Sequence, residues 1–205
     1  MFSYEESLKI LKETNALLEG HFILSSGLHS NQYIQCAKLL SYPKKAEKIC
    51  NSLCKKISKT YKKIDTILSP ALGGVVIGYE VGRQLGIQTI FAERYNNDLI
   101  LRRGFEITKN SNVLIVEDVI TTGKSALECH EIIKKNEANL VGYACIIDRS
   151  DKNILIKDKI VSQVKIDIRT FSENEVPEDL KKINVTKPGS RNISKWKKKE
   201  DLALT

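Results

Sequence analysis

The sequence lacks any apolar run that approaches the ~20 residues needed to cross a bilayer, so we expect no membrane-spanning segment. Its first residues, MFSYEESLKILKE, are amphipathic and charged and lack the apolar stretch of a signal peptide. The five cysteines are odd in number and scattered, and no Cys-x-x-Cys pair occurs among them. A disulfide framework and a zinc site are therefore not expected, and the pattern predicts reduced thiols in a cytoplasmic protein.

Histidine is also scarce, with three residues in the chain. His21, His29 and His130 have no acidic or thiol partner at a spacing typical of a catalytic pair, so we interpret them as structural. No repeat stands out, and the one biased segment is the lysine-rich C-terminal end. A catalytic histidine is therefore not predicted.

The net charge of +8 could indicate nucleic-acid binding, but the placement of the basic residues argues against it. Six of the 33 basic residues lie between positions 187 and 199, where there is no acid. Others belong to the solvent side of one predicted helix: Lys44, Lys45, Lys48, Lys55 and Lys56. A solvated tail, a solvated helix face and a small anionic substrate account for the excess, so nucleic acid is not an expected partner.

Strands alternate with helices along the chain, which predicts a single α/β domain of 205 residues with a doubly wound, mostly parallel sheet. We assign a small N-terminal hood to about residues 1–40, the α/β core to about 60–170 and a basic tail to about 187–205. Predicted strands cover residues 64–69, 87–92, 113–116, 140–148 and 164–168, with a hairpin over 21–35 that turns at Gly27 and a polar stretch over 95–112. One predicted helix starts at Ser3, carries Leu8, Leu11 and Leu18 on one face and ends at Gly20; the others start after Pro43, end near Gly86 and end near Asn136.

The most informative segment is VLIVEDVITTGKS, residues 113–125. A buried-strand pattern leads to Glu117 and Asp118, then to a hydroxyl-rich loop around Gly123, then to a helical pattern. The loop would present backbone N–H groups and hydroxyls at a helix N-terminus, which suits a phosphate monoester. Carboxylates repel phosphate, so the acid pair should meet neutral hydroxyls or a metal. A ribose 5-phosphate meets both requirements; a plain strand-to-helix turn capped by Thr and Ser is the alternative.

This segment resembles the signature of type I phosphoribosyltransferases, which bind phosphoribosyl pyrophosphate (PRPP). The resemblance implies that Glu117 and Asp118 are the catalytic residues, holding the ribose 2- and 3-hydroxyls beside the reacting carbon. It implies that the loop cradles the 5-phosphate with Val119, Ile120, Thr121, Thr122, Gly123, Lys124 and Ser125.

Among these enzymes the chain most resembles the orotate phosphoribosyltransferase family. The matching pieces are residues 22–27 with Ser30 and Tyr33, 69–74, 91–94 with 101–105, 148–150 and 187–191. The resemblance implies transfer of the 5-phosphoribosyl group from PRPP to orotate, giving orotidine 5-monophosphate and pyrophosphate in UMP biosynthesis. It also implies Mg²⁺ as cofactor, held mainly by PRPP, pyrophosphate and water without a direct protein ligand.

The resemblance assigns a pyrophosphate site to Leu72, Gly73 and Gly74, whose backbone would approach the ligand closely. Arg94 would add positive charge to the same group. A simple helix-entry turn at the glycines and an ordinary surface role for Arg94 are the alternatives.

For orotate, the resemblance implies contacts from Thr121, Tyr33 and Ile34. Arg149 would bind the orotate carboxylate, because the two nitrogens of a guanidinium match the two oxygens of a carboxylate. Core packing for Tyr33, and a surface pairing of Arg149 with Asp148 or Asp151, remain open as alternatives.

The chain departs from better-known members of that family, which carry lysines in the hood, the pyrophosphate loop and the mobile loop, and a histidine in the mobile loop. Ser25 and Gly73 stand in the first two places, and residues 95–101 contain neither lysine nor histidine. We therefore predict that Arg102 and Arg103 supply the loop charge. The region just before Lys187, residues 173–185, contains no cysteine, so a tail metal site is not expected. The resemblance also implies a homodimer whose mobile loop acts in trans.

Two other functions stay open at this point. A phosphoribosyltransferase for another base would share the signature but would not need Arg149. A PRPP-binding regulator would need a DNA-reading domain, and only ~20 residues precede the hood. A separate orotidine monophosphate decarboxylase is a candidate partner, because the chain is too short to contain that second enzyme.

Overall fold

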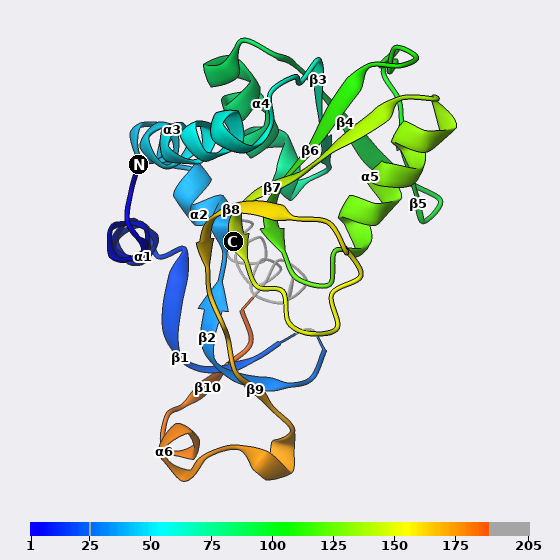
Figure 1. Cartoon of the computed structure of the whole chain (residues 1–205). Helices are drawn as coiled ribbons and strands as arrows, with labels where there is room; N and C mark the ends of the chain where they lie inside the picture. The colour runs from blue at the N-terminus through cyan, green and yellow to red at the C-terminus, as the bar shows by residue number, and fades with distance from the viewer. Residues whose placement is uncertain (25, 189–205) are drawn as a thin grey trace, which may run out of the picture.

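A six-stranded sheet forms the centre of the computed structural model, which describes residues 1–24 and 26–188 (Figure 1). The strand order is β5-β4-β3-β6-β7-β8, and each neighbouring pair is parallel except β4 with β5. The strands are β3 Thr66–Pro70, β4 Gln88–Tyr95, β5 Asp98–Leu101, β6 Asn112–Ile120, β7 Asn139–Asp148 and β8 Ile160–Lys165. The mostly parallel α/β fold predicted from the sequence is therefore confirmed.

Helices cover both faces of this sheet (Figure 1). Helices α3 (Pro43–Thr60) and α4 (Gly73–Leu85) pack in one core cluster, and α5 (Lys124–Lys135) packs in the other. Side chains alternate along β6, so Leu114 belongs to the first cluster and Val113 and Ile115 belong to the second. This two-sided burial explains why the strand reads as a continuous apolar run.

A second, smaller sheet makes the hood, with strand order β10-β1-β2-β9. Its strands are β1 Leu17–Ile23, β2 His29–Ile34, β9 Thr170–Phe171 and β10 Val185–Thr186. Strands β1 and β2 form the predicted antiparallel hairpin, and Gly27 turns the chain with φ +84°. Strands β9 and β10 come from the other end of the chain, so the hood sheet is not made by N-terminal residues alone. The remaining elements are α2 Cys36–Leu40, a 3-10 turn at Glu173–Glu175 and α6 Glu178–Lys181.

Several boundaries differ from the sequence prediction, including those of α1 and β8. Helix α1 spans Tyr4–Glu13 and begins with the predicted capping box at Ser3, but it ends well before Gly20, and Leu18 lies in β1. The helix stops because the Thr14 hydroxyl bonds to two carbonyls of the last turn and Asn15 adopts φ +54°. Strand β8 begins at Ile160 and ends at Lys165, earlier than predicted.

The predicted polar stretch after Tyr95 contains strand β5, which pairs with β4 as a tight hairpin. Asn96 and Asn97 occupy its turn with φ +50° and +71°, the left-handed conformation that asparagine tolerates and that two-residue hairpin turns require. The segment expected to form a mobile loop is thus hydrogen-bonded strand for much of its length.

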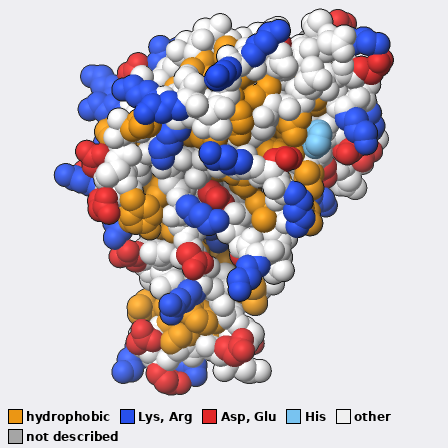
Figure 2. Space-filling model, in the orientation of Figure 1, with side chains coloured by type: hydrophobic (Ala, Val, Ile, Leu, Met, Phe, Trp, Pro, Cys, Tyr) orange, Lys and Arg blue, Asp and Glu red, His pale blue; other side chains and the backbone are white. Residues whose placement is uncertain are grey.

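Basic side chains gather over the α3 end of the molecule, as Figure 2 shows. Lys44, Lys48 and Lys55 are exposed, in line with the predicted solvent face. Lys56 is different, because its ammonium donates to the carbonyls of Ser162 and Gln163 in β8. The predicted basic tail from residue 189 onward, and Ser25 of the hood, lie outside the described residues.

All five cysteines are free and buried, and none of the described helices combines the length and apolarity needed to cross a membrane.

Candidate active site

The acid pair lies inside strand β6 rather than after it, since the strand continues to Ile120. Consecutive strand residues point to opposite faces, so Glu117 and Asp118 serve different parts of the site. Asp118 faces the start of α4: a Cβ added at Gly73 would lie 2.7 Å from its Oδ1. Glu117 lines a cavity on the α5 side, together with the hydroxyl loop. Near its carboxyl end, the strand therefore places one carboxyl on each face of the sheet.

Both carboxyls lie where a negative charge is poorly solvated. Burial raises the pKa of Glu117 to about 8, helped by the nearby carboxylates of Asp118 and Glu128. Burial also raises the pKa of Asp118, against the opposing effect of backbone N–H groups at Val119 and Asp118 itself. A ligand that brings hydroxyl donors or positive charge would satisfy these two groups, whereas an anion would not.

The hydroxyl loop joins β6 to α5 and surrounds a cavity of about 180 Å³. Gly123 stands at the N-cap of α5 with φ +79°, and a Cβ there would lie 2.8 Å from Ile156. Only glycine fits both the backbone conformation and this contact. The first turn of α5 thus opens toward the cavity, which is lined by Glu117, Val119, Thr121, Thr122, Gly123, Lys124 and Ser125. Backbone donors, hydroxyls and one lysine are groups that suit a phosphate ligand.

The predicted pyrophosphate loop lies between β3 and α4. It contains a cis Ala71–Leu72 peptide, and the Leu72 side chain is 85% exposed. A Cβ at Gly74 would lie 3.2 Å from the carbonyl oxygen of Val116 in β6, so the loop backbone packs directly against the strand that carries the acid pair. Gly73 and Gly74 are therefore needed for this close approach, beyond any role in starting the helix.

The three predicted loop cations lie on the β4–β5 hairpin and its continuation, and each has a protein partner. Arg94 forms an ion pair with Glu128 of α5 and donates to the carbonyl of Asn97 at 2.7 Å. Arg103 pairs with Glu93 at 3.0 Å. Arg102 lies over the ring of Tyr95, with 5.2 Å between the guanidinium carbon and the ring centroid. None of the three lines the cavity of the hydroxyl loop.

Arg149 and Tyr33, predicted to bind the base, are brought together from the core and the hood. Arg149 follows β7, and its backbone N–H donates to the carbonyl of Ile120 at the end of the acid-pair strand. Burial lowers the pKa of Arg149, and its positive charge acts on the Tyr33 hydroxyl. The Nε atom of Arg149 is buried without a hydrogen-bond partner in the described part of the chain.

Neither suggested surface pairing of Arg149 occurs. Asp148 pairs with Lys165 at 3.6 Å, and Asp151 accepts a hydrogen bond from the backbone N–H of Asn153. Tyr33 is half-buried and is not a core residue. Its hydroxyl donates to Gln35, and its ring centroid lies 5.8 Å from that of Phe22. The Ile34 side chain points into the core cluster, so any contact with a base would involve its backbone.

Two residues near the site were not predicted from the sequence. Glu128 forms an ion pair with Arg94 and helps to raise the pKa of Glu117, and Lys165 forms an ion pair with Asp148. Each contact joins residues from different elements, and nothing local in the sequence signals it.

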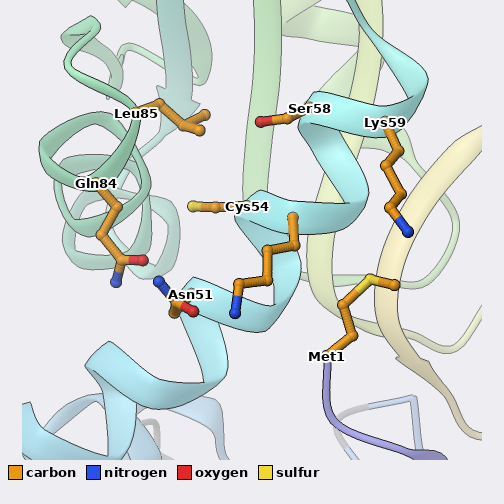
Figure 3. A pocket seen from close by; sticks show the side chains of 8 residues that line it. Met1, Asn51, Cys54, Ser58, Lys59, Gln84 and Leu85 are labelled. Carbon is orange, nitrogen blue, oxygen red and sulfur yellow. The ribbon is translucent and has the colours of Figure 1, made fainter.

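Two larger cavities lie elsewhere, where the N-terminus meets α3 and α4. Their volumes are about 560 and 630 Å³, and both are lined by Met1, Asn51, Lys55 and Gln84. Figure 3 shows the first of them, with side chains of α3 and α4 on its two walls. It lacks the acid pair and the hydroxyl loop, so its size does not make it the better candidate. The chemistry that suits a phosphorylated sugar lies at the edge of the main sheet.

Comparisons with known proteins show the family to which the chain belongs. Residues 40–182 match the family described as "Phosphoribosyl transferase domain". The chain is 42% identical over 187 residues to an orotate phosphoribosyltransferase of Chlorobium phaeobacteroides (strain BS1), covering 91% of this chain and 96% of that protein.

The solved structures that share the fold at low identity include enzymes for different bases. The orotate phosphoribosyltransferase of Aeropyrum pernix superimposes with a TM-score of 0.68 at 22% identity, over 77% of this chain and 92% of that one. The adenine phosphoribosyltransferase of Thermoanaerobacter pseudethanolicus gives 0.56 at 17% identity, over 66% and 88%. The same fold thus serves relatives with different bases, and the fold alone does not identify the base.

Proposed function

The chain belongs to the phosphoribosyltransferase family, and from this premise we propose that it transfers the 5-phosphoribosyl group of PRPP to orotate, giving orotidine 5-monophosphate and pyrophosphate. The observation that carries the choice of base is Arg149. Its guanidinium is partly buried, has no acidic partner among the described residues and lies beside Tyr33 of the hood. A planar base with a carboxylate supplies the missing partner. A neutral purine leaves that cation unpaired.

We assign the ribose to the acid pair and the 5-phosphate to the loop from Thr121 to Ser125. Glu117 and Asp118 accept hydrogen bonds from the ribose hydroxyls and lie beside the anomeric carbon. The bond from that carbon to pyrophosphate breaks ahead of the bond that forms to the orotate ring nitrogen, so positive charge develops on the sugar. The nitrogen gives up its proton to the departing pyrophosphate. The ribose hydroxyls and this positive charge favour the ionised form of both acids, whose carboxylates then stabilise the charge, so no protein nucleophile is needed.

The pyrophosphate is assigned to the backbone of Leu72, Gly73 and Gly74, with charge from the hairpin arginines. Arg94 and Arg103 are held by ion pairs on the surface, which contribute little and exchange readily for a phosphate group. Arg102, held over Tyr95, is exposed on the same hairpin. The hairpin thus carries three partly exposed cations that are available to an anionic ligand.

Mg²⁺ fits this arrangement. The described residues contain no group of three or more His, Cys, Asp or Glu that could hold a metal ion by themselves. Mg²⁺ commonly binds substrate phosphates and keeps several waters, and we propose that PRPP, pyrophosphate and water hold it here, because the acid pair is assigned to the ribose hydroxyls. When bound, the ion neutralises charge on the departing pyrophosphate.

The direct test follows orotate absorbance in the presence of PRPP and Mg²⁺. We expect a loss of absorbance that requires both substrates, with no turnover of adenine, guanine or uracil under the same conditions. Turnover of a purine in place of orotate would reassign the base. PRPP binding without turnover of any base would favour a regulator that senses PRPP.

We also propose that the protein is a homodimer. Leu72 at the N-cap of α4 is followed at spacings of four and three by Val76 and Tyr79 of the helix, and the three are 85%, 51% and 65% exposed. An apolar stripe next to the pyrophosphate loop suits a second copy of the chain, whose hairpin would then reach this site. Val76→Glu should shift the mass measured by light scattering from dimer to monomer. Tyr4→Glu, at an equally exposed tyrosine of α1, should not, and an unchanged dimer in both variants would remove the stripe from the interface.

The five free thiols suit a reducing compartment, and we propose the cytoplasm. The product keeps the carboxylate of orotate, so a decarboxylase must consume it on the way to UMP. We propose that this enzyme is a separate protein.

A further inference from the structure

At the end of β7, a buried acid and a partly buried arginine, Asp148 and Arg149, are consecutive residues. Asp148 is 6% exposed, and its carboxylate lies directly before Arg149 in the chain. A buried carboxylate next to a partly buried guanidinium would normally pair with it. Such a pair would occupy the cation that the proposed function assigns to orotate.

The structure resolves this problem through the neighbouring strand. Lys165 stands opposite Asp148 in the register of β7 with β8, and its Nζ lies 3.6 Å from Asp148 Oδ2. The same Nζ is 3.3 Å from the Ser150 hydroxyl. The other carboxylate oxygen, Oδ1, accepts the backbone N–H of Ser150 at 2.8 Å. Asp148 is thereby satisfied on both oxygens without Arg149.

The backbone holds Arg149 in place at the same time. Its N–H donates to the carbonyl of Ile120 at 2.8 Å, and the carbonyl of Asp148 accepts the N–H of Ile166 at 2.9 Å. The turn is fixed to the strands on both sides, while the Arg149 Nε has no partner in the described part of the chain. Arg149 is therefore held firmly by its backbone and left free at its side chain.

We infer that Lys165 is a positioning residue for orotate recognition: by acting as the counter-ion of Asp148, it keeps Arg149 available for the carboxylate of the base. The inference rests on the proposed function. Lys165 itself need not touch the substrate, and its side chain is 61% exposed, so its ammonium stays hydrated while it neutralises the buried acid.

The test is a double-mutant cycle on orotate kinetics. Lys165→Met leaves Asp148 with one hydrogen bond, so Asp148 should capture Arg149, and KM for orotate should rise about tenfold with KM for PRPP unchanged. Asp148→Asn still accepts the N–H of Ser150 and carries no charge, so adding it to Lys165→Met should restore KM for orotate to within about twofold of wild type. Lys165→Arg should behave like wild type.

Lys159→Met, at an exposed lysine just before β8, is the matched control and should leave both KM values unchanged. A normal KM for orotate in Lys165→Met would overturn the inference, and so would a double variant no better than the single one. A parallel rise in KM for PRPP would also overturn it, because that result indicates general damage to the site. Wild-type protein that does not turn over orotate refutes the proposed function instead, so the two failures are distinguishable.

Discussion

At the scale of single residues, the site depends on ionisable groups that the fold keeps in unfavourable surroundings. Glu117 and Asp118 are carboxyls with raised pKa values, and Arg149 is a cation with a lowered one. The charge of each is disfavoured by burial in the free protein, and in the proposed mode of binding a part of the substrates complements it. The burial that suits these groups to the substrates therefore lowers the stability of the free protein.

Glu117→Gln should make this opposition visible as a pH-dependent gain in stability. The pKa of Glu117 is about 8 in the folded protein against an ordinary value of 4.5, so the folded state holds a proton that the unfolded state has lost between these values. Wild-type stability contributed by this group is present below pH 4.5 and is lost as the pH rises toward 8. The variant avoids that loss. Its melting temperature should exceed that of wild type on the order of 5 °C at pH 8.5 and much less at pH 5.5; an equal difference at both pH values would contradict the raised pKa.

Arg149→Ala should separate the two substrates. Removing the guanidinium should raise Kd for orotate by about 100-fold, since a buried charge-assisted pair is lost, while PRPP binding stays nearly normal. Isothermal titration with each ligand measures this. Equal weakening of both ligands would show that Arg149 has a structural role only.

At the scale of helices and strands, local sequence signals located most of the fold. Pro43 begins α3, Gly86 caps α4, and the apolar run from Val113 to Val116 is fully buried strand. The same signals placed the acid pair and the hydroxyl loop next to one another. Elements that depend on distant partners were not predictable. Strands β9 and β10 have two residues each and exist because β2 and β1 pair with them.

Some features of the site were also beyond sequence reasoning, for the same physical reason. The pairing of Arg94 with Glu128, and that of Asp148 with Lys165, each join two elements whose relative position is set by the packed sheet. Residue type and spacing identified Arg94 and Arg149 as cations near the site. Residue type and spacing carried no information on which of these two arginines forms an ion pair with an acidic residue.

Gly73→Ala tests the contact between α4 and β6. The new methyl group would lie 2.7 Å from Asp118 Oδ1, so the carboxylate must move away from its position beside the ribose. We expect kcat to fall by about 100-fold with little change in melting temperature, since the site is misplaced rather than the core. Gly86→Ala is the contrasting variant: it stands at a left-handed C-cap with open space around it, so it should lower the melting temperature and spare kcat. Normal activity in Gly73→Ala would show that Asp118 can shift away from residue 73 without loss of function.

At the scale of the whole molecule, two sheets meet around Tyr33 and Arg149, and the proposed dimer would add a hairpin from a second copy. The charge on that hairpin comes from Arg94, Arg102 and Arg103, because residues 95–101 contain no cation. Whether this charge serves its own site or the partner's is a property of the assembly.

Subunit mixing can decide between the two arrangements. The Arg102→Ala/Arg103→Ala variant and the Asp118→Asn variant should each have low activity, by roughly 100-fold or more for Asp118→Asn. If the hairpin acts in trans, a mixed dimer contains one site with all defects and one with none, and activity should recover toward half of wild type. Absence of recovery despite demonstrated subunit exchange refutes the trans arrangement. Full activity of the double-arginine variant alone would remove these residues from the mechanism.

The hood sheet joins the two ends of the described chain, and this has a consequence for how the protein is made. His21 contacts the carbonyl of Ile183, 162 residues further along, and β1 pairs with β10 directly. During synthesis on the ribosome, the six strands of the main sheet are all available before β9 and β10 emerge, so the core can assemble while β1 and β2 still lack their outer neighbours. The proposed base-binding side of the site is then the last part to become ordered, and a nascent chain should acquire affinity for PRPP before it acquires affinity for orotate.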